Sequence, residues 1–106
     1  MGLSEQLKLH GQWIELNKRL KLHAQWVQNP SEGEQLVESG DALKGVDLQS
    51  ANLRGAVLRY ADLRGVNLQG AILKKADLQE ACLQLADLQR ANLQWACLQH
   101  ATLPEE

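Results

Sequence analysis

Leucine recurs at every fifth position over residues 41–106, and this period constrains the fold more than any other feature of the chain. On an α-helix, a step of five residues rotates the side chain by about 500°, so successive leucines would share no face. On a straight strand, an odd step places each leucine on the opposite side. The chain must therefore turn once per repeat if all of these leucines are buried. The predicted core leucines are Leu43, Leu48, Leu53, Leu58, Leu63, Leu68, Leu73, Leu78, Leu83, Leu88, Leu93, Leu98 and Leu103.

The residue two positions before each leucine indicates where the straight part of the repeat lies. It is alanine in ten of thirteen repeats, with Val46, Val66 and Asp41 as the exceptions. Because residues two apart on a strand point the same way, alanine and leucine both point inward and the residue between them points outward. The remaining two positions form a corner, where glycine adopts turn geometry easily. The glycines at these positions are Gly45, Gly55, Gly65 and Gly70.

The consensus A(D/N)LXX resembles the repeat of the pentapeptide-repeat family. The matching stretches read ANLRG at 51–55, ADLRG at 61–65, ADLQE at 76–80, ADLQR at 86–90 and ANLQW at 91–95. The resemblance covers residues 41–106. It implies an all-β solenoid, namely a right-handed quadrilateral β-helix with four repeats per coil and about three coils. Periodicity by itself implies only a turn every five residues.

A narrow coil lined by alanine and leucine is expected to have a filled, dry interior without room for a ligand. Its flat outer faces assemble no nucleophile–base pair, phosphate-binding glycine loop or buried carboxylate pair. Cys97 and His100 are three residues apart and Cys82 lies on a neighbouring face, which is too few converging ligands for zinc. We therefore predict a protein that is not an enzyme, with no catalytic residues, no cofactor, no metal site and no disulfide.

Residues 1–40 lack the repeat and are predicted to form a helix and a connector ahead of the β-helix over 41–106. Residues 3–28 contain no proline and are rich in Leu, Glu, Lys and Gln, which favours a helix. The Asn-Pro pair at 29–30 is a stop signal. Because a solenoid end exposes apolar core and unpaired strand edges, this helix is the expected N-terminal cap. The sequence HAQW at 23–26 resembles a His-x-x-Trp pattern that family members often carry before their repeats.

The helical segment contains a duplication, because LKLHGQW at 7–13 recurs as LKLHAQW at 20–26. An offset of thirteen residues turns the second copy by about 220° on a continuous helix, which produces two apolar stripes. One stripe holds Leu9, Trp13, Leu16, Leu20 and Val27. The other holds Leu3, Leu7, Ile14, Leu22 and Trp26.

One solenoid end can cover only one of these stripes, so the helix is expected to mediate self-association as a homodimer. The alternative is a helix–turn–helix cap, broken around Glu15–Lys18, that packs both stripes within one chain. His10 and His23 are expected to be solvated or interfacial rather than catalytic. The candidate interface residues are Leu9, Trp13, Leu16, Leu20, Leu22, Trp26 and Trp95.

Four repeats per coil would stack residues twenty apart, which places Lys75 over Trp95 and Arg54 next to Lys74 in the same column. We predict a cation–π contact between the Lys75 ammonium and the indole. Trp95 is interpreted either as an interface residue or as a shield for the stack. The small basic patch is compatible with an acidic partner or a phosphate, and its simpler interpretation is a solvated face.

The predicted function is a non-catalytic structural or protein-interaction module with an unidentified protein partner. The alternative is a DNA-mimicking protein that binds a type II topoisomerase, as some relatives do, but those relatives resemble long acidic rods. The net charge of -2 also disfavours nucleic-acid binding, which needs Lys and Arg gathered on one face. Without an apolar stretch of ~18 residues or a signal-peptide pattern, we expect no membrane insertion and a cytoplasmic protein.

Overall fold

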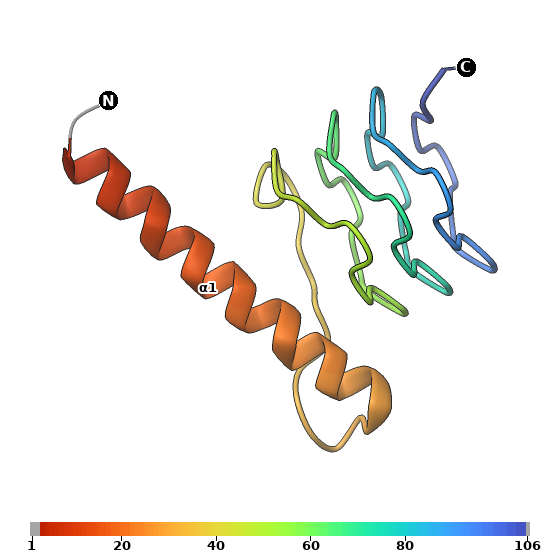
Figure 1. The fold of residues 1–106 in the computed structure, drawn as a ribbon. Helices are drawn as coiled ribbons and strands as arrows, with labels where there is room; N and C mark the ends of the chain where they lie inside the picture. The colour runs from red at the N-terminus through yellow and green to blue at the C-terminus, as the bar shows by residue number, and fades with distance from the viewer. Residues whose placement is uncertain (1–2, 106) are drawn as a thin grey trace.

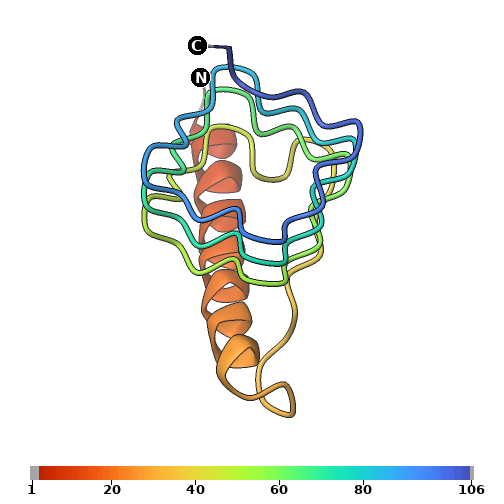
Figure 2. The same cartoon turned by 90° about the vertical axis from the view of Figure 1, so that its right-hand side faces the viewer.

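The computed structural model describes the backbone of residues 3–105 and the side chains of residues 11–105. The chain begins with helix α1, Leu3–Gln28, and then passes through a connector into a stack of turns (Figure 1). Two perpendicular views place α1 across the end formed by the first turn, with the last turn on the far side (Figures 1 and 2).

Helix α1 is continuous over its 26 residues, which confirms the helix predicted from the sequence at 3–28. The alternative of a break around Glu15–Lys18 is therefore wrong. At the end of the helix, the Asn29 N–H still donates to the Gln25 C=O at 2.9 Å. The Asn29 side-chain oxygen then accepts from the Ser31 hydroxyl at 2.8 Å, in a local turn that starts the connector.

The stacked turns are joined by single-residue parallel bridges, and no longer strand occurs among residues 3–105. All but one of the bridges join residues twenty apart, as in the pairs Asn52↔Ile72 and Ile72↔Asn92. This spacing is the one that four five-residue repeats per turn require. Viewed nearly along the stack, successive turns lie on top of one another (Figure 2). Each side of a turn is too short for a regular strand because a corner follows every three extended residues.

The pairing starts upstream of the leucine register. Val37 pairs with Val57, and Gly40 pairs with Ala61 at the one irregular spacing of twenty-one. Leu36 is 1% exposed and lies twenty residues before Ala56, so a leucine fills the inward position that alanine holds in later turns. The connector thus contributes part of the first turn, although the leucine register begins only at Leu43.

Each regular repeat uses nearly all of its backbone N–H groups. In the repeat at 76–80, the N–H of the alanine donates to the preceding leucine C=O and closes the corner. The outward residue donates to the turn before, whereas the leucine and the second corner residue donate to the turn after. All four bonds measure 2.8–3.0 Å. The remaining N–H, that of Gln79, donates to the Asp77 carboxylate at 3.2 Å.

This last bond gives the outward Asp or Asn of the consensus a structural role that the period alone did not reveal. Its side-chain oxygen accepts the one N–H that the ladder leaves free, two residues further along, in an Asx turn. The residues that act in this way are Asp47, Asn52, Asp62, Asn67, Asp77, Asp87 and Asn92. Where Val57, Ile72 or Cys82 stands outward, the side chain supplies no such acceptor.

The second corner residue has a positive φ, between 59° and 73°, in every turn from Gly45 to His100. A positive φ at the third of four residues, closed by a hydrogen bond, is type II turn geometry. The four corner glycines predicted from the sequence fit this conformation. The other corners are occupied by residues with side chains, which are Ser50, Tyr60, Lys75, Glu80, Leu85, Arg90, Trp95 and His100.

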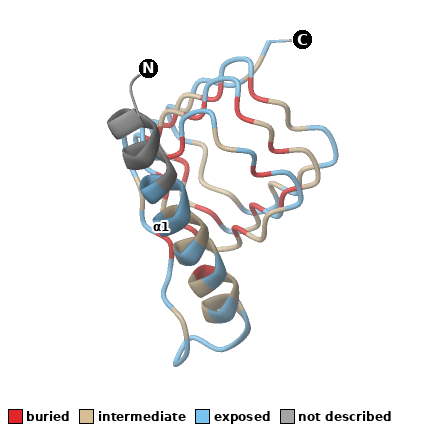
Figure 3. Ribbon diagram, turned by 60° about the vertical axis from the view of Figure 1, so that its left-hand side comes forward, coloured by how far each residue is buried: buried red, intermediate tan, exposed pale blue. Residues whose placement is uncertain are grey.

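Burial follows the leucine register from the helix end of the stack to the far end. The register leucines from Leu43 to Leu83 are at most 1% exposed. Leu88, Leu93 and Leu98 are half-buried, and Leu103 in the last turn is 48% exposed. Buried residues line the inside of the turns and lie where α1 meets the first of them (Figure 3). The interior is therefore filled by side chains.

Substitutions at the stacked corner residues Gly65 and Leu85 can distinguish the effect of backbone strain on stability from the effect of side-chain packing. Both residues have positive φ, a Cβ built at Gly65 meets nothing within 4 Å, and Leu85 is 86% exposed. We expect Leu85→Gly to raise the free energy of unfolding by about 1 kcal/mol and Gly65→Ala to lower it by a similar amount. Urea denaturation measures both changes. Leu85→Ala is the control and should change stability little, since it keeps the strained φ; a Leu85→Gly variant no more stable than Leu85→Ala would contradict this interpretation.

Candidate functional site

His23 joins α1, the connector and the first turn, and it is 0% exposed although it is polar. Its Nδ1 accepts from the Leu36 N–H at 2.8 Å, and its Nε2 lies 3.0 Å from the Arg54 C=O. A backbone N–H only donates and a carbonyl only accepts, so the ring is neutral and carries its proton on Nε2. One imidazole thus satisfies two backbone groups from different segments.

These two groups lack the partners that a preceding turn would supply. In the next turn, the Lys74 C=O accepts from the Gly55 N–H of the turn before it, at 2.9 Å. The Arg54 C=O occupies the equivalent position in the first turn, where no earlier turn exists, and His23 donates instead. Likewise, an inward alanine such as Ala56 donates to the leucine three residues earlier, whereas Leu36 donates to His23. His23 therefore completes the backbone pairing at the open end of the stack.

Burial lowers the pKa of His23 below 6.5 because desolvation penalises the charged ring, and the hydrogen bond with Arg54 opposes only part of this effect. Protonation would place a hydrogen on Nδ1, directly facing the Leu36 N–H. Of the two surroundings expected for His23, solvated or interfacial, the structure shows the second, because the ring lies at an interface within the chain. His10 lies outside the described side chains.

Trp26 is one helical turn after His23 and lies on the same face of α1. The two rings stack, with centroids 5.4 Å apart and an interplanar angle of 25°. The indole lies so close to Gly55 that a Cβ built there would be 3.1 Å from Trp26 Cζ3. The His-x-x-Trp pattern noted in the sequence therefore holds the helix onto the first turn.

Two further turns of α1 complete this contact. Leu16 and Leu20 pack against the buried core. Arg19, between them, forms an ion pair with Glu38 and donates to the Val37 C=O at 3.1 Å. Glu38 is twenty residues before Leu58, so it occupies the position in the repeat that leucine holds in later turns. Arg19 of α1 neutralises its carboxylate there.

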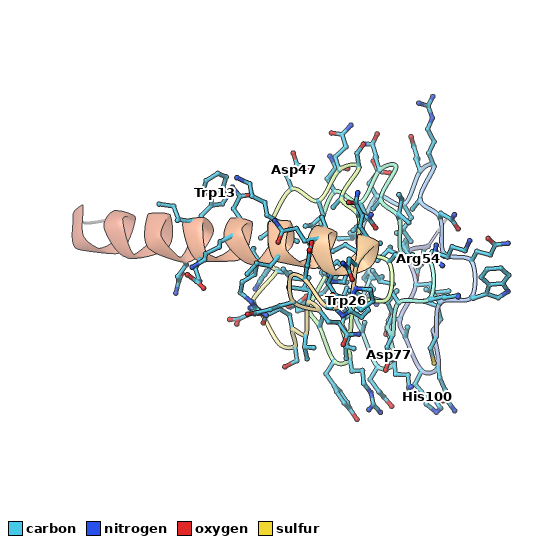
Figure 4. All side chains as sticks on the ribbon, turned by 90° about the horizontal axis from the view of Figure 1, so that it is seen from below. Trp13, Trp26, Asp47, Arg54, Asp77 and His100 are labelled. Carbon is cyan, nitrogen blue, oxygen red and sulfur yellow. The ribbon has the colours of Figure 1, made fainter. Side chains whose placement is uncertain are left out.

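Before Leu16, α1 diverges from the stack of turns. Trp13 and Ile14 are 57% and 50% exposed. Trp13 lies on the part of α1 that extends beyond the turns (Figure 4). A groove of about 800 Å³ runs between this part of the helix and the first turn, where Ala42 and Val46 line its opposite wall. The groove is lined by apolar side chains and by charged ones from both walls, and it adjoins the exposed Trp13 of α1.

The remaining candidate interface residues lie in different surroundings. The side chain of Leu9 is outside the described residues, and Leu22 is half-buried. Trp95 is 66% exposed at a corner, with Lys75 Nζ 5.7 Å from its ring centroid. This distance confirms the predicted cation–π contact. Lys74 Nζ lies closer to the Trp95 centroid, at 4.8 Å. The twenty-residue spacing did not predict this contact, because Lys74 belongs to the column next to that of Trp95.

No three His, Cys, Asp or Glu side chains in the described part of the chain gather as metal ligands would. Cys82 and Cys97 are free and half-buried. The helix described at residues 3–28 has no stretch apolar enough to cross a bilayer. Two features of the described surface are the groove beside α1 and an aromatic, basic corner formed by Trp26, Arg54, Lys75 and Trp95.

The repeats of this chain match those of a known protein family. A family model described as "Pentapeptide repeats" matches with eight copies, over residues 42–74, 51–90 and 73–103. This family implies a right-handed quadrilateral β-helix. No curated protein matches the sequence.

Two solved structures are similar in sequence, and both are pentapeptide repeat proteins of cyanobacterial strains. One, from Nostoc PCC 7120, is 31% identical, with 60% of this chain and 70% of that chain covered and a TM-score of 0.26. The other, from Cyanothece 51142, is 33% identical, with 57% of this chain and 50% of that chain covered and a TM-score of 0.25. With TM-scores this low, neither structure carries an argument about how α1 and the turns are arranged.

The buried neutral His23 should make stability depend on pH. Because the folded pKa lies below 6.5, the unfolded chain binds the proton first as the pH falls. The contribution of His23 is therefore complete above about pH 6.5 and is lost as the pH falls from there towards the folded pKa. We expect His23→Phe to lower the free energy of unfolding at pH 7.5 by about 2 kcal/mol, because it leaves a buried donor and acceptor unpaired.

Urea denaturation at pH 7.5 and pH 5 measures this effect, and the difference between wild type and His23→Phe should shrink at the lower pH. His100→Gln is the matched control, since His100 is exposed, and it should keep the wild-type pH dependence. Equal pH dependence in wild type and His23→Phe would contradict the proposed role of the ring.

Proposed function

We propose that this chain, which belongs to the pentapeptide-repeat family, is a non-catalytic structural module. In this proposal it acts by binding other proteins, and it pairs with a second copy of itself through α1. Proteins of this family are generally non-catalytic structural or interaction modules. The filled interior supports this proposal, because binding and association are then left to the outer faces and the ends. A cytoplasmic location is part of the proposal, since two free thiols on different faces are typical of a reducing compartment.

In this proposal, α1 is the cap of the β-helix. Its contact with the first turn combines Leu16 and Leu20 against the core with the hydrogen bonds of His23. Apolar contact covers the open end, and the imidazole pairs backbone groups that would otherwise face solvent or another chain. A cap of this kind prevents strand addition at that end and leaves the diverging part of α1 free for a different task.

The observation that carries the pairing proposal is the exposure of Trp13 and Ile14 on the part of α1 that diverges from the turns. The two residues are adjacent, so their side chains point about 100° apart around α1 and each belongs to a different one of the two apolar stripes. Burying side chains of this size contributes about 1.5–3 kcal/mol each. About half of each side chain is still available for burial, and in a two-fold pair each contact occurs twice, which favours association through this segment. The second copy's α1 is the proposed occupant of this surface.

Trp13→Gln tests the pairing, because it removes the largest exposed apolar side chain of α1 while keeping a good helix former. We expect wild type to sediment as a dimer at micromolar concentration and Trp13→Gln to dissociate about tenfold more readily. Trp95→Gln is the matched control, since Trp95 is similarly exposed, at 66% against 57% for Trp13, but lies on a turn. A monomeric wild type, or equal weakening by Trp95→Gln, would contradict pairing through α1.

A further inference from the structure

A second surface lies where the end of α1 meets the corner formed by Gly55, Lys75 and Trp95. It is a depression of about 180 Å³. Its lining residues are Trp26, Val27, Pro30, Arg54, Gly55 and Lys75. Trp26 and Arg54 lie at this junction in Figure 4. The depression thus has an apolar wall supplied by the helix end and a basic wall supplied by the turns.

The positive charge of this corner is uncompensated. The ion pairs among the described side chains involve Arg19, Arg59 and Arg64 with nearby carboxylates. None of the described carboxylates pairs with Arg54, Lys74 or Lys75, although the chain as a whole carries a net charge of -2. Other described cations, Lys18, Lys21, Lys44 and Arg90, are unpaired as well, but Arg54, Lys74 and Lys75 are the three that gather at one corner.

The cations are also held in place. The Lys75 N–H donates to the Gln94 C=O at 3.0 Å, so the backbone of the corner is fixed to the turn after it. The ammonium groups of Lys74 and Lys75 both lie over the Trp95 ring, 4.8 and 5.7 Å from its centroid. Side chains that are restrained before binding lose less conformational entropy when a ligand arrives.

The size of the depression limits what it can hold. Pockets for whole small molecules usually measure about 300–1,000 Å³, so about 180 Å³ has room for a single side-chain-sized group. Arginine binds carboxylate and phosphate groups with two parallel hydrogen bonds, and lysine adds a point charge. Trp26, Val27 and Pro30 provide apolar surface for a residue next to that group.

We propose that this corner is a docking site for an oxyanion, a carboxylate or a phosphate monoester, carried by an extended peptide segment of a partner protein. Arg54 and Lys75 bind the oxyanion, and the helix end packs against an apolar neighbour in the peptide. The proposal rests on the proposed function in that the ligand belongs to a protein partner. It does not depend on pairing through Trp13, which lies towards the other end of α1.

Titration of isotopically labelled protein with three synthetic peptides tests the proposal. The peptides share one sequence, with leucine beside a central glutamate, phosphoserine or glutamine. The backbone amide signals of Gly55 and Lys75 report binding. We expect the glutamate or the phosphoserine peptide to bind about tenfold more tightly than the glutamine peptide, and the stronger of the two identifies the group.

Lys75→Gln and Arg54→Gln should each weaken this binding by about fivefold. Arg90→Gln is the matched control, because Arg90 occupies the same corner position with the same positive φ and loses the same charge on a different corner. Equal binding of all three peptides, or equal weakening by Arg90→Gln and Lys75→Gln, would overturn the proposal. If Arg54→Gln fails to fold, Lys75→Gln alone decides. Trp13→Gln should bind the peptides as wild type does, so failure of self-association and failure of docking are distinguishable.

Discussion

Burial of one leucine per five residues is the constraint on which the rest of this structure depends. The chain must turn after each leucine, and the corner then takes a type II turn with positive φ whatever residue stands there. Four corners return the chain to its starting direction, so residues twenty apart pair in parallel. The N–H that this geometry leaves free is the one that the outward Asp or Asn accepts, as Asp77 does for Gln79. One hydrophobic period thereby determines the backbone pairing and the polar consensus together.

A repeat of this kind leaves an end without partners, and in the proposed function α1 caps this end. His23 supplies the acceptor and the donor that a preceding turn would have given to Leu36 and Arg54. A histidine suits this position because the neutral ring offers one of each on opposite sides. The same helix diverges from the turns beyond Leu16, so one half of it is committed to its own chain and the other is open. The basic corner beside Trp26 arises at the boundary between the two.

The sequence predicted the features that follow from a period or from a local signal. The buried leucines, the corner glycines and the helix ending at Asn-Pro belong to this class, as does the stacking of Lys75 on Trp95. Features that depend on a missing neighbour could not be predicted in this way. The His-x-x-Trp pattern marked His23 but indicated neither its burial nor its two backbone partners, and Leu36 enters the core without belonging to the leucine register. In both cases the deciding partner comes from another segment and follows no repeat.

Amide hydrogen exchange of the native protein, resolved by residue, tests the five-residue turn most directly. The N–H groups of Leu58, Leu73 and Leu83 donate to the next turn, at 2.7–2.8 Å, and should exchange slowly. The following residues, Arg59, Lys74 and Gln84, have neither a ladder partner nor an Asx acceptor and should exchange fast. A protection pattern that repeats every five residues is the predicted result. Arg59, Lys74 and Gln84 protected as strongly as their preceding leucines would contradict the turn geometry and the β-helix built from it.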